Sequence, residues 1–350
     1  CRSSPLMMKF ASSPAHLLDK NLVSSETGTW LANHFKVSLR RVKPQIDELF
    51  IGGINHIFYH GITYSPVEEE FPGWLFYAST NFGQSSHFWD ELPLLNHYIE
   101  NCQKLLQEAK PDNNILIYFP IDELWTKNRG ETLLQLDVHH YDKWFTNTTF
   151  GNTTELLWNN GYTFDYISDK QISLLNVDSC MNVSISGKSK YQTIVVPAID
   201  YIPEKTWEEF KKIAKQGMKI IFTDKLPKYY SGFSARKENA QNIESAEEVL
   251  SGNQNFIVSS NLTDDIRKLN ILPEELKNQG LDFIRKTNSD GTLYFITNLG
   301  NKFLEDSVTL SAQYKFVTIL DPQTNKRGYI ETANKFYMTI PPGKSFFIQT

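Results

Sequence analysis

Cysteine is scarce in this sequence of 350 residues: there are three, and their spacing matches no metal-binding motif. No run of 18 apolar residues is present, so we expect no transmembrane helix. Aspartate and glutamate (40) outnumber lysine and arginine (35), which gives a net charge of −5 and leaves no basic stripe. Neither nucleic-acid binding nor membrane insertion is therefore expected.

The motifs of several common enzyme classes are also missing. No GxGxxG or P-loop sequence occurs, and the GKS at 187–189 lacks the upstream glycine, so we interpret it as a turn. HExxH, CxxC and aspartate-rich calcium loops are absent as well, which leaves a metal site weakly supported by the residues themselves.

What the sequence does contain is concentrated near its start. All eight histidines lie before residue 141, and all seven tryptophans lie before residue 208. The same region alternates strand and helix patterns. We predict a strand at 21–26, a helix at 38–51, a strand at 54–61, a long aromatic loop at 62–92 and a helix at 93–109. This order is a βα repeat and predicts parallel strands.

Two further segments follow. Residues 112–280 alternate short apolar strands with an amphipathic helix at 204–217, which predicts a doubly wound α/β domain of the flavodoxin or glutamine-amidotransferase type. Its predicted strands are 114–120, 164–168, 192–198, 219–224 and 255–259. Residues 281–350 carry alternating runs around an Asp290-Gly291 turn and two later turns, which predicts part of a small β-sandwich. The expected division is therefore 1–111, 112–280 and 281–350.

Two side chains stand where predicted strands end. Glu26 closes the first strand and His60 the second, and the carboxyl ends of parallel barrel strands are where catalytic groups lie. Simpler interpretations stay open. Glu26 could cap a turn or pair with Arg40 or Arg41. His56, which lies mid-strand between apolar residues, is more readily explained as a hydrogen-bonded core histidine.

Aromatic residues gather in the loops beyond these strand ends. Sugar rings stack their C–H faces on such side chains while their hydroxyl groups form directional hydrogen bonds. The candidates are Trp30, Tyr59, Tyr64, Trp74, Tyr77 and Trp89. Trp74 could instead pack the loop down, and the acidic run Glu68–Glu70 is expected to be a solvated loop.

An ordered series of motifs at matching spacing resembles glycoside hydrolase family 106, the α-L-rhamnosidases and their bacterial relatives. The series is AHLLDKNLVSSETGTWLANHF, FIGGINHIFYHGITYSP, PGWLFYASTNF and LLNHYIENCQKLLQ followed by NNILIYFPIDELW. The resemblance covers residues 10–230 and is most specific in 10–125.

The resemblance implies a (β/α)₈ barrel whose seventh and eighth strands are NLVSSE and INHIFYHG. Glu26 then matches the general base of an inverting mechanism, with Gly28 permitting a tight turn and Trp30 buttressing the carboxylate. His60, Tyr64 and Trp74 match positions that line the sugar pocket. The family also implies a calcium ion whose ligands cannot be assigned here, and a periplasmic or extracellular location. The expected partner is an oligosaccharide or polysaccharide.

Inverting glycoside hydrolysis needs a second carboxyl group as general acid. Since a barrel takes about 250 residues, we expect this chain to be the C-terminal part of a larger enzyme whose acid lies upstream of residue 1. On its own it should have little or no activity. An acid from Glu68–Glu70, Asp90 or Glu91 is a weaker possibility, because loop carboxylates lack rigid support. The alternative function is a non-catalytic carbohydrate-binding or scaffold protein derived from such an enzyme.

Overall fold

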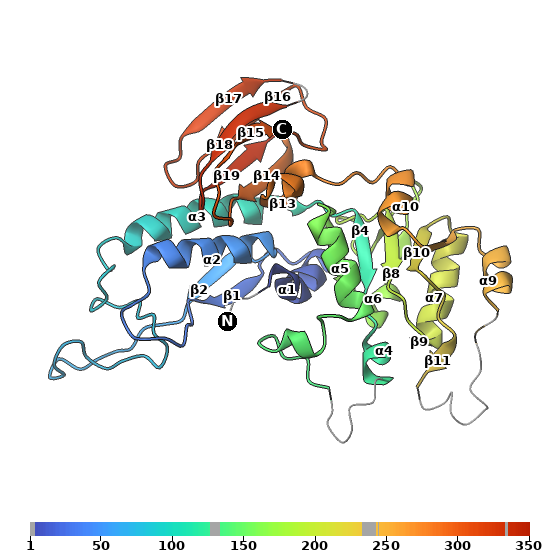
Figure 1. The fold of residues 1–350 in the computed structure, drawn as a ribbon, viewed down its shortest axis with the longest axis horizontal. Coiled ribbons are helices and arrows are strands. Elements are labelled where there is room, and N and C mark those ends of the chain that lie inside the picture. Colours follow the sequence, from blue (N-terminus) through green and yellow to red (C-terminus); the bar gives the residue numbers. More distant parts are fainter. Residues whose placement is uncertain (1–3, 127–133, 233–242, 244, 333–334) are drawn as a thin grey trace. The chain divides into compact units, whose positions relative to one another are not determined.

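The computed structural model describes residues 4–126, 134–232, 243, 245–332 and 335–350. Its elements are labelled in Figure 1. The described residues group into two compact units. The first contains the residues up to Ser12, Lys20–Pro111 and Glu275–Thr350, and the second contains Ser13–Asp19 and Asp112–Glu274. The expected segments 1–111 and 281–350 thus lie largely in one unit, for reasons that the sheet pairing explains below.

The first unit begins with a two-stranded parallel sheet. Strand β1 (Ser24–Thr27) pairs with β2 (His56–Tyr59), as the βα order predicted, although both strands are shorter than expected. Helices α2 (Leu39–Ile51) and α3 (Leu92–Glu108) follow the two strands and pack against each other (Figure 1). Both helices were predicted within a residue or two of their observed ends.

The sequence explains where α2 lies and ends. Its buried positions recur at helical spacing and include Val42, Ile46, Leu49 and Phe50. Gly52 closes the helix and Gly53 turns the chain with φ +93°, a conformation that glycine adopts without strain. The helix therefore presents one apolar face to its unit.

A β-sandwich completes the first unit. Strands β13 (Asp282–Asn288) and β14 (Gly291–Thr297) form the predicted hairpin, whose two loop residues are Ser289 and Asp290. One sheet has the order β17-β16-β19-β14-β13-β3 and the other pairs β15 with β18. The remaining bounds are β3 Lys110–Pro111, β15 Leu304–Val308, β16 Phe316–Leu320, β17 Arg327–Glu331, β18 Phe336–Ile340 and β19 Ser345–Gln349.

Two features join the sandwich to the first segment. Strand β3, which follows α3 directly, is the edge strand beside β13. On the helix side, Phe50 of α2 meets Phe295 of β14 edge to face at 5.7 Å, and Phe295 meets Phe347 of β19 at 5.0 Å. The two expected segments therefore share one unit because a strand and an aromatic cluster cross between them.

The second unit is built on a five-stranded parallel sheet in the order β12-β10-β8-β4-β5. All five strands had been predicted. Their bounds are β4 Ile115–Tyr118, β5 Phe164–Ile167, β8 Thr193–Val196, β10 Lys219–Thr223 and β12 Phe256–Ser259. If these five strands are numbered 1 to 5 along the chain, their order in the sheet, starting from β5, is 2-1-3-4-5. This is the flavodoxin-like order that was expected.

Helices cover both faces of this sheet. On one face Phe210 of α7 (Glu204–Lys215) meets Tyr118 of β4 at 5.6 Å. On the other, Phe150 of α5 (Thr149–Asn159) meets Tyr166 of β5 at 5.0 Å. Tyr166 is in register with Ile117, and neighbours along a strand point to opposite faces, so the two helices lie on opposite sides. The predicted helix at 204–217 is α7, and α5 was not predicted.

The described chain contains further helices and strands in addition to those named above. They are α1 Pro5–Leu17, α4 Ile121–Thr126, η1 Tyr141–Lys143, α6 Asp169–Ile172, β6 Asn176–Val177, β7 Val183–Ser184, β9 Tyr201–Pro203, β11 Tyr229–Ser231, α9 Ala246–Gly252, α10 Leu262–Lys268 and η2 Glu275–Gln279. Among the described helices none is both long enough and apolar enough to cross a membrane.

A buried carboxylate anchors the second unit. Asp165 of β5 is fully buried, and its oxygens accept hydrogen bonds from Ser13 (3.0 Å), Asn113 (2.7 Å) and Tyr191 (2.8 Å). His16 Nδ1 lies 3.0 Å from the same carboxylate. A buried charge is tolerated only when it is paired and hydrogen-bonded in this way.

Candidate active site at the ends of β1 and β2

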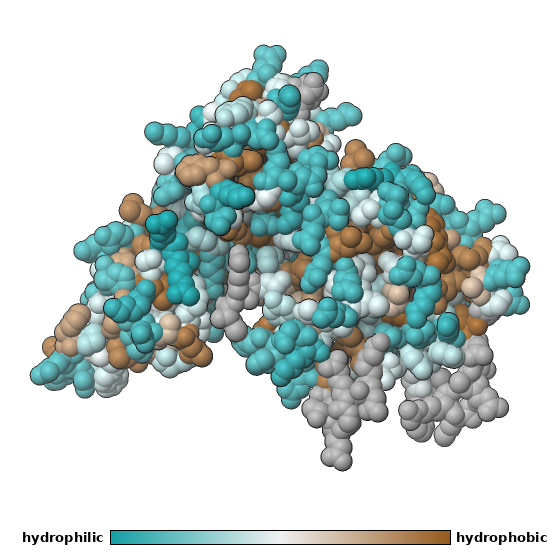
Figure 2. All heavy atoms as spheres, viewed as in Figure 1, coloured by the Kyte–Doolittle hydropathy of each residue, from teal (hydrophilic) through white to brown (hydrophobic). Residues whose placement is uncertain are grey.

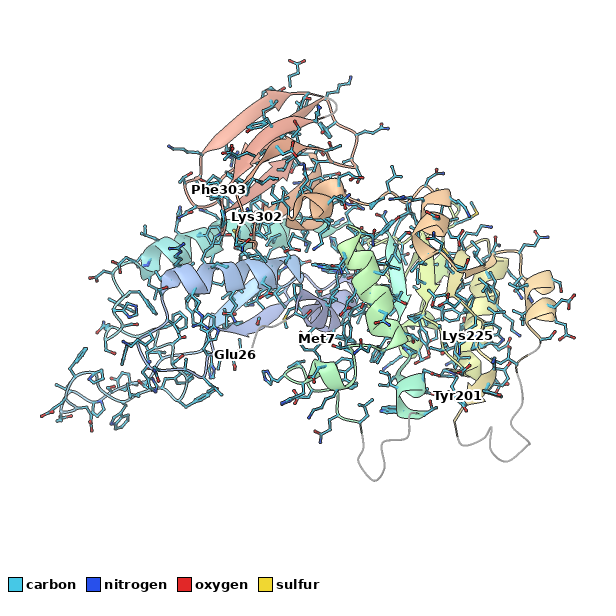
Figure 3. All side chains as sticks on the ribbon, viewed as in Figure 1. Met7, Glu26, Tyr201, Lys225, Lys302 and Phe303 are labelled. Carbon is cyan, nitrogen blue, oxygen red and sulfur yellow. The ribbon has the colours of Figure 1, made fainter. Side chains whose placement is uncertain are left out.

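One face of the two-stranded sheet is open. Glu26 of β1 is in register with Phe58 of β2, and side chains in register on parallel strands point to the same side. The Glu26 side chain is 64% exposed and Phe58 is 53% exposed. On the opposite face Thr27 is buried, and the Tyr59 hydroxyl donates to Asn96 of α3 over 2.7 Å. The helices thus cover the face of the sheet that is opposite to Glu26. Figure 3 labels Glu26 on the side of the strands away from α2.

The open face carries the candidate carboxylate and its partners. Glu26 Oε2 lies 3.2 Å from His60 Nδ1, so the two residues predicted at the strand ends lie together. Thr29 approaches both: its Oγ1 lies 2.9 Å from His60 Nδ1 and 3.4 Å from Glu26 Oε2. Glu26 therefore pairs with a histidine and a hydroxyl group.

The turn after β1 depends on Gly28. Its φ is +92°, and a Cβ atom built on it would lie 2.6 Å from the Phe82 ring. Phe82 in turn stacks on Tyr59 with ring centroids 4.3 Å apart. Burial raises the pKa of the Tyr59 hydroxyl far above its usual value. The expected tight turn at Gly28 is present, and glycine is needed there for space as well as for conformation.

Trp30 lies differently from the expectation. Its ring is covered by the Arg41 guanidinium, 5.4 Å from the ring centroid, and its carbonyl oxygen accepts hydrogen bonds from the Ser79 amide and hydroxyl. The contacts of the Glu26 carboxylate are to Thr29 and His60 instead. The simpler interpretation of an ion pair between Glu26 and Arg41 is not observed, because Arg41 stacks on Trp30.

His60 is held by the aromatic loop. Its ring meets Phe76 edge to face at 4.6 Å and Tyr77 at 5.6 Å. Phe76 and Thr29 had not been singled out from the sequence. Thr29 lies three residues after Glu26 and directly after Gly28. This turn position was the sequence signal that could have indicated a contact with Glu26. His56 was expected to be a hydrogen-bonded core histidine. It is hydrogen-bonded to Ser24 at 2.9 Å, but it is only half-buried and lies outside the core.

The other aromatic candidates lie along the loop, and their side chains are exposed to solvent. Tyr64 is 94% exposed, Trp74 55% and Trp89 38%, and among the described residues no contact joins them to Glu26 or His60. Trp74 is fixed through its backbone: its amide donates to Ser65 and its carbonyl accepts from Thr63. Figure 2 shows apolar side chains spread among hydrophilic ones over this loop. Glu68–Glu70, Asp90 and Glu91 are exposed, as expected of a solvated loop.

The family resemblance also implies a calcium ion. Calcium takes six to eight oxygen ligands, mostly carboxylates and carbonyls. Within the described ranges no three His, Cys, Asp or Glu side chains are placed to hold a metal ion together. Calcium binding therefore stays a prediction, with no ligands assigned among the described residues.

The family model described as alpha-L-rhamnosidase, of glycoside hydrolase family 106, matches residues 4–333. The solved rhamnosidase of Novosphingobium sp. PP1Y superposes with a TM-score of 0.76 at 15% identity, covering 99% of this chain and 33% of that one. A β-galactosidase of Bacillus circulans sp. alkalophilus superposes with a TM-score of 0.56 at 10% identity, covering 97% and 58%. At these identities the two structures show a shared fold.

A curated protein of Formosa agariphila, named "Putative beta-glucuronidase", is 22% identical over 315 residues, which are 88% of this chain and 24% of that protein. The chain thus spans about a quarter to a third of the length of the rhamnosidase and of this relative. Since the family model matches nearly the whole chain, the chain belongs to glycoside hydrolase family 106, the α-L-rhamnosidase family.

Proposed function

We propose that Glu26 is the general base of an inverting glycoside hydrolase that removes terminal α-L-rhamnosyl, or closely related, units from polysaccharides. The observation that carries this proposal is the state of its two carboxylate oxygens. Oε2 is held by Thr29 and His60 on the open face of β1 and β2. Among the described residues Oε1 has no hydrogen-bond partner, so it is available to a water molecule.

The reaction needs two carboxyl groups. Glu26 accepts a proton from water while the water oxygen forms a bond to the anomeric carbon from one side. The bond to the leaving oxygen breaks on the other side, and that oxygen takes a proton from a carboxylic acid about 6.5–9.5 Å from Glu26. This acid is proposed to lie outside the chain, on another strand of a barrel that β1 and β2 help to close.

The barrel itself is a proposal that rests on the faces of the sheet. β1 and β2 are parallel, each is followed by a helix or a loop and helix, and helices cover one face while Glu26 and Phe58 occupy the other. Strands of a (β/α)₈ barrel have this arrangement, with catalytic groups at their carboxyl ends. The exposed rings of Tyr64, Trp74 and Trp89 are proposed to bind sugar rings by stacking, whereas the Trp30 ring is already covered by Arg41.

The location and partner follow from the same proposal. A hydrolase of polysaccharides meets its substrate outside the cytoplasm, so we propose a periplasmic or extracellular protein with an oligosaccharide or polysaccharide as its partner.

Glu26→Gln tests the function in the whole protein from the source cells. We expect an aryl α-L-rhamnoside to be hydrolysed by the wild type with inversion, seen as the β-anomer first formed in proton NMR. The variant should lose roughly 10²–10⁴-fold in kcat, which is what a general base supplies. Full activity of Glu26→Gln would overturn the role of Glu26. Glu305→Gln, an exposed residue of the sandwich, is the matched control.

The sugar is tested separately, since the curated relative carries a glucuronidase name. A panel of aryl rhamnosides, fucosides and glucuronides would rank the substrates of the whole protein. If every glycoside is bound but none is cleaved, the alternative of a non-catalytic carbohydrate-binding protein becomes the better description.

A further inference from the structure

A single hydroxyl group lies between the two side chains of the proposed site. Thr29 Oγ1 is 2.9 Å from His60 Nδ1 and 3.4 Å from Glu26 Oε2, and Nδ1 and Oε2 are themselves 3.2 Å apart. The three polar atoms therefore form a small triangle. Which atoms carry hydrogen decides whether this triangle is stable.

For a neutral imidazole, only hydrogen on Nδ1 satisfies all three atoms. A carboxylate accepts only, a hydroxyl has one hydrogen, and a neutral imidazole has one N–H. If Nδ1 carried no hydrogen, two acceptors would face each other across 3.2 Å, and the Thr29 hydrogen could serve just one of them. With hydrogen on Nδ1, the ring donates to the Thr29 hydroxyl, and that hydroxyl donates to Glu26.

This assignment has a consequence for the opposite atoms. A neutral His60 with its hydrogen on Nδ1 has a lone pair on Nε2, so Nε2 is an acceptor. Among the described residues neither His60 Nε2 nor Glu26 Oε1 has a hydrogen-bond partner. The site thus presents two acceptors, one for the water nucleophile and one for a hydroxyl group of the sugar.

The surroundings keep the triangle in place. The His60 ring is packed against Phe76 at 4.6 Å and Tyr77 at 5.6 Å, which limits its rotation. Thr29 follows Gly28, whose positive φ directs the chain back toward Glu26. The Thr29 hydroxyl is also 3.4 Å from the His60 carbonyl oxygen, so it lies against the end of β2 as well.

We propose that Thr29 is a positioning residue: its hydroxyl holds one oxygen of Glu26 and accepts from His60 Nδ1–H. Together with the Glu26 carboxylate it fixes the Nδ1–H tautomer, so that Nε2 accepts from a substrate hydroxyl. The catalytic part of this inference rests on the proposed function. The tautomer part rests only on the geometry.

Kinetics of the whole protein test the catalytic part. Thr29→Val keeps the branched shape and removes the hydroxyl, and Thr29→Ser keeps the hydroxyl. We expect Thr29→Val to lose about 10–100-fold in kcat, the value of one hydrogen bond to a charged group, with a small change in KM. Thr29→Ser should recover most of the loss. Thr287→Val is the matched control, because Thr287 is exposed and donates to a backbone carbonyl in the sandwich hairpin.

Spectroscopy of the present chain, labelled with ¹⁵N at its histidines, tests the tautomer part. The imidazole signal of His60 is assigned by its loss in His60→Gln. We expect the Nδ1–H pattern in the wild type, in Thr29→Ser and in Thr29→Val, because the Glu26 carboxylate still faces Nδ1 at 3.2 Å in all three. A shift toward the Nε2–H pattern is expected only in the double variant Glu26→Ala/Thr29→Val, which removes both partners of Nδ1. Thermal unfolding of Thr29→Val beside Thr287→Val shows whether the fold is retained.

The outcomes separate the two proposals. If the wild type hydrolyses its glycoside but Thr29→Val matches it in kcat, the positioning role of Thr29 is wrong and the function stands. If the wild type cleaves no glycoside, the proposed function fails, and the His60 spectra of the wild type and the double variant still decide whether Glu26 and Thr29 set the tautomer. The Nε2–H pattern in the wild type would contradict that part of the inference. Equal losses in Thr29→Val and Thr29→Ser would also contradict the inference, because the hydroxyl would not be the cause.

Discussion

Ser345 of β19 donates its hydroxyl hydrogen to the Asp47 carboxylate of α2 over 2.6 Å, across 298 residues of sequence. Asp47 is fully buried, and its carboxylate also accepts from Lys43 at 2.7 Å and from Tyr98 of α3 at 2.6 Å. One carboxylate thus ties both helices behind the candidate site to the sandwich sheet.

The Asp47 cluster leads to a prediction about stability. Asp47→Ala leaves the Lys43 ammonium and the Ser345 and Tyr98 hydroxyls without their buried acceptor. We expect a loss of about 3–5 kcal/mol in the free energy of unfolding, measured by urea denaturation. Glu305→Gln, an exposed strand residue of the same unit, should change it by less than about 0.5 kcal/mol. A loss as small as that of the control would show that the cluster contributes nothing net.

A second prediction concerns alkaline pH. Burial raises the pKa of Tyr98, Tyr118, Tyr166 and Tyr191 above the usual value of 10.0, and in all four a nearby aspartate raises it further. These hydroxyls bind their protons more tightly in the folded chain than in the unfolded one. Their stabilising effect is therefore complete below pH 10.0 and is lost as the pH rises above it.

We expect the free energy of unfolding to fall above pH 10, because the unfolded chain then loses protons that the folded chain keeps. Near-ultraviolet absorbance of tyrosinate, followed together with circular dichroism, checks this. The buried tyrosines should ionise in the same step in which the fold is lost. Complete ionisation of all sixteen tyrosines in a chain that is still folded would contradict the prediction.

Gly28 gives a third prediction. Gly28→Ala forces a side chain into a positive φ and into the Phe82 ring, so we expect a loss of about 1–3 kcal/mol in stability and a displaced Thr29. Combining it with Phe82→Ala removes the collision and leaves the strain at φ. The double variant should therefore be less than additive in denaturant unfolding. Strict additivity would mean that the contact between Gly28 and Phe82 is unimportant.

The activity of the isolated 350-residue chain is a fourth prediction. Glu26 is held by His60 and Thr29, whereas the loop carboxylates Glu68–Glu70, Asp90 and Glu91 are exposed. We expect no measurable turnover of an aryl α-L-rhamnoside by this chain, while the whole protein turns it over. Turnover by the chain alone, abolished in Glu91→Gln or Asp90→Asn, would place the acid in the loop instead.

Local pattern was enough to predict much of the fold. The apolar spacing of α2 and α3, the five strands of the second unit and the Asp290-Gly291 hairpin were all read correctly, because each depends on neighbours in sequence. The first strand was predicted from Asn21 but begins at Ser24, since Asn21 and Leu22 are exposed. Helix α5 was missed.

Only the part of the candidate site that depends on local sequence pattern was predicted. Glu26 and His60 were found because both follow strand patterns, and their contact at 3.2 Å follows from parallel pairing. The role of Thr29 depends on the φ of Gly28, and the stacking of Trp30 depends on Arg41, so neither could be seen in spacing alone. The clusters of Asp47 and Asp165 join residues far apart in sequence, which no local pattern reveals.

The short strand β3 has a consequence for how the chain is built. It places Pro111 in the same sheet as β13, while the first unit resumes at Glu275. Residues Asp112–Glu274, the larger part of the α/β unit, are therefore an insertion into a domain whose two halves are joined by sheet pairing, by the Phe50–Phe295 contact and by Asp47. A protease cut inside residues 112–274 would break the polypeptide yet leave the two halves of the outer domain bound as complementary pieces.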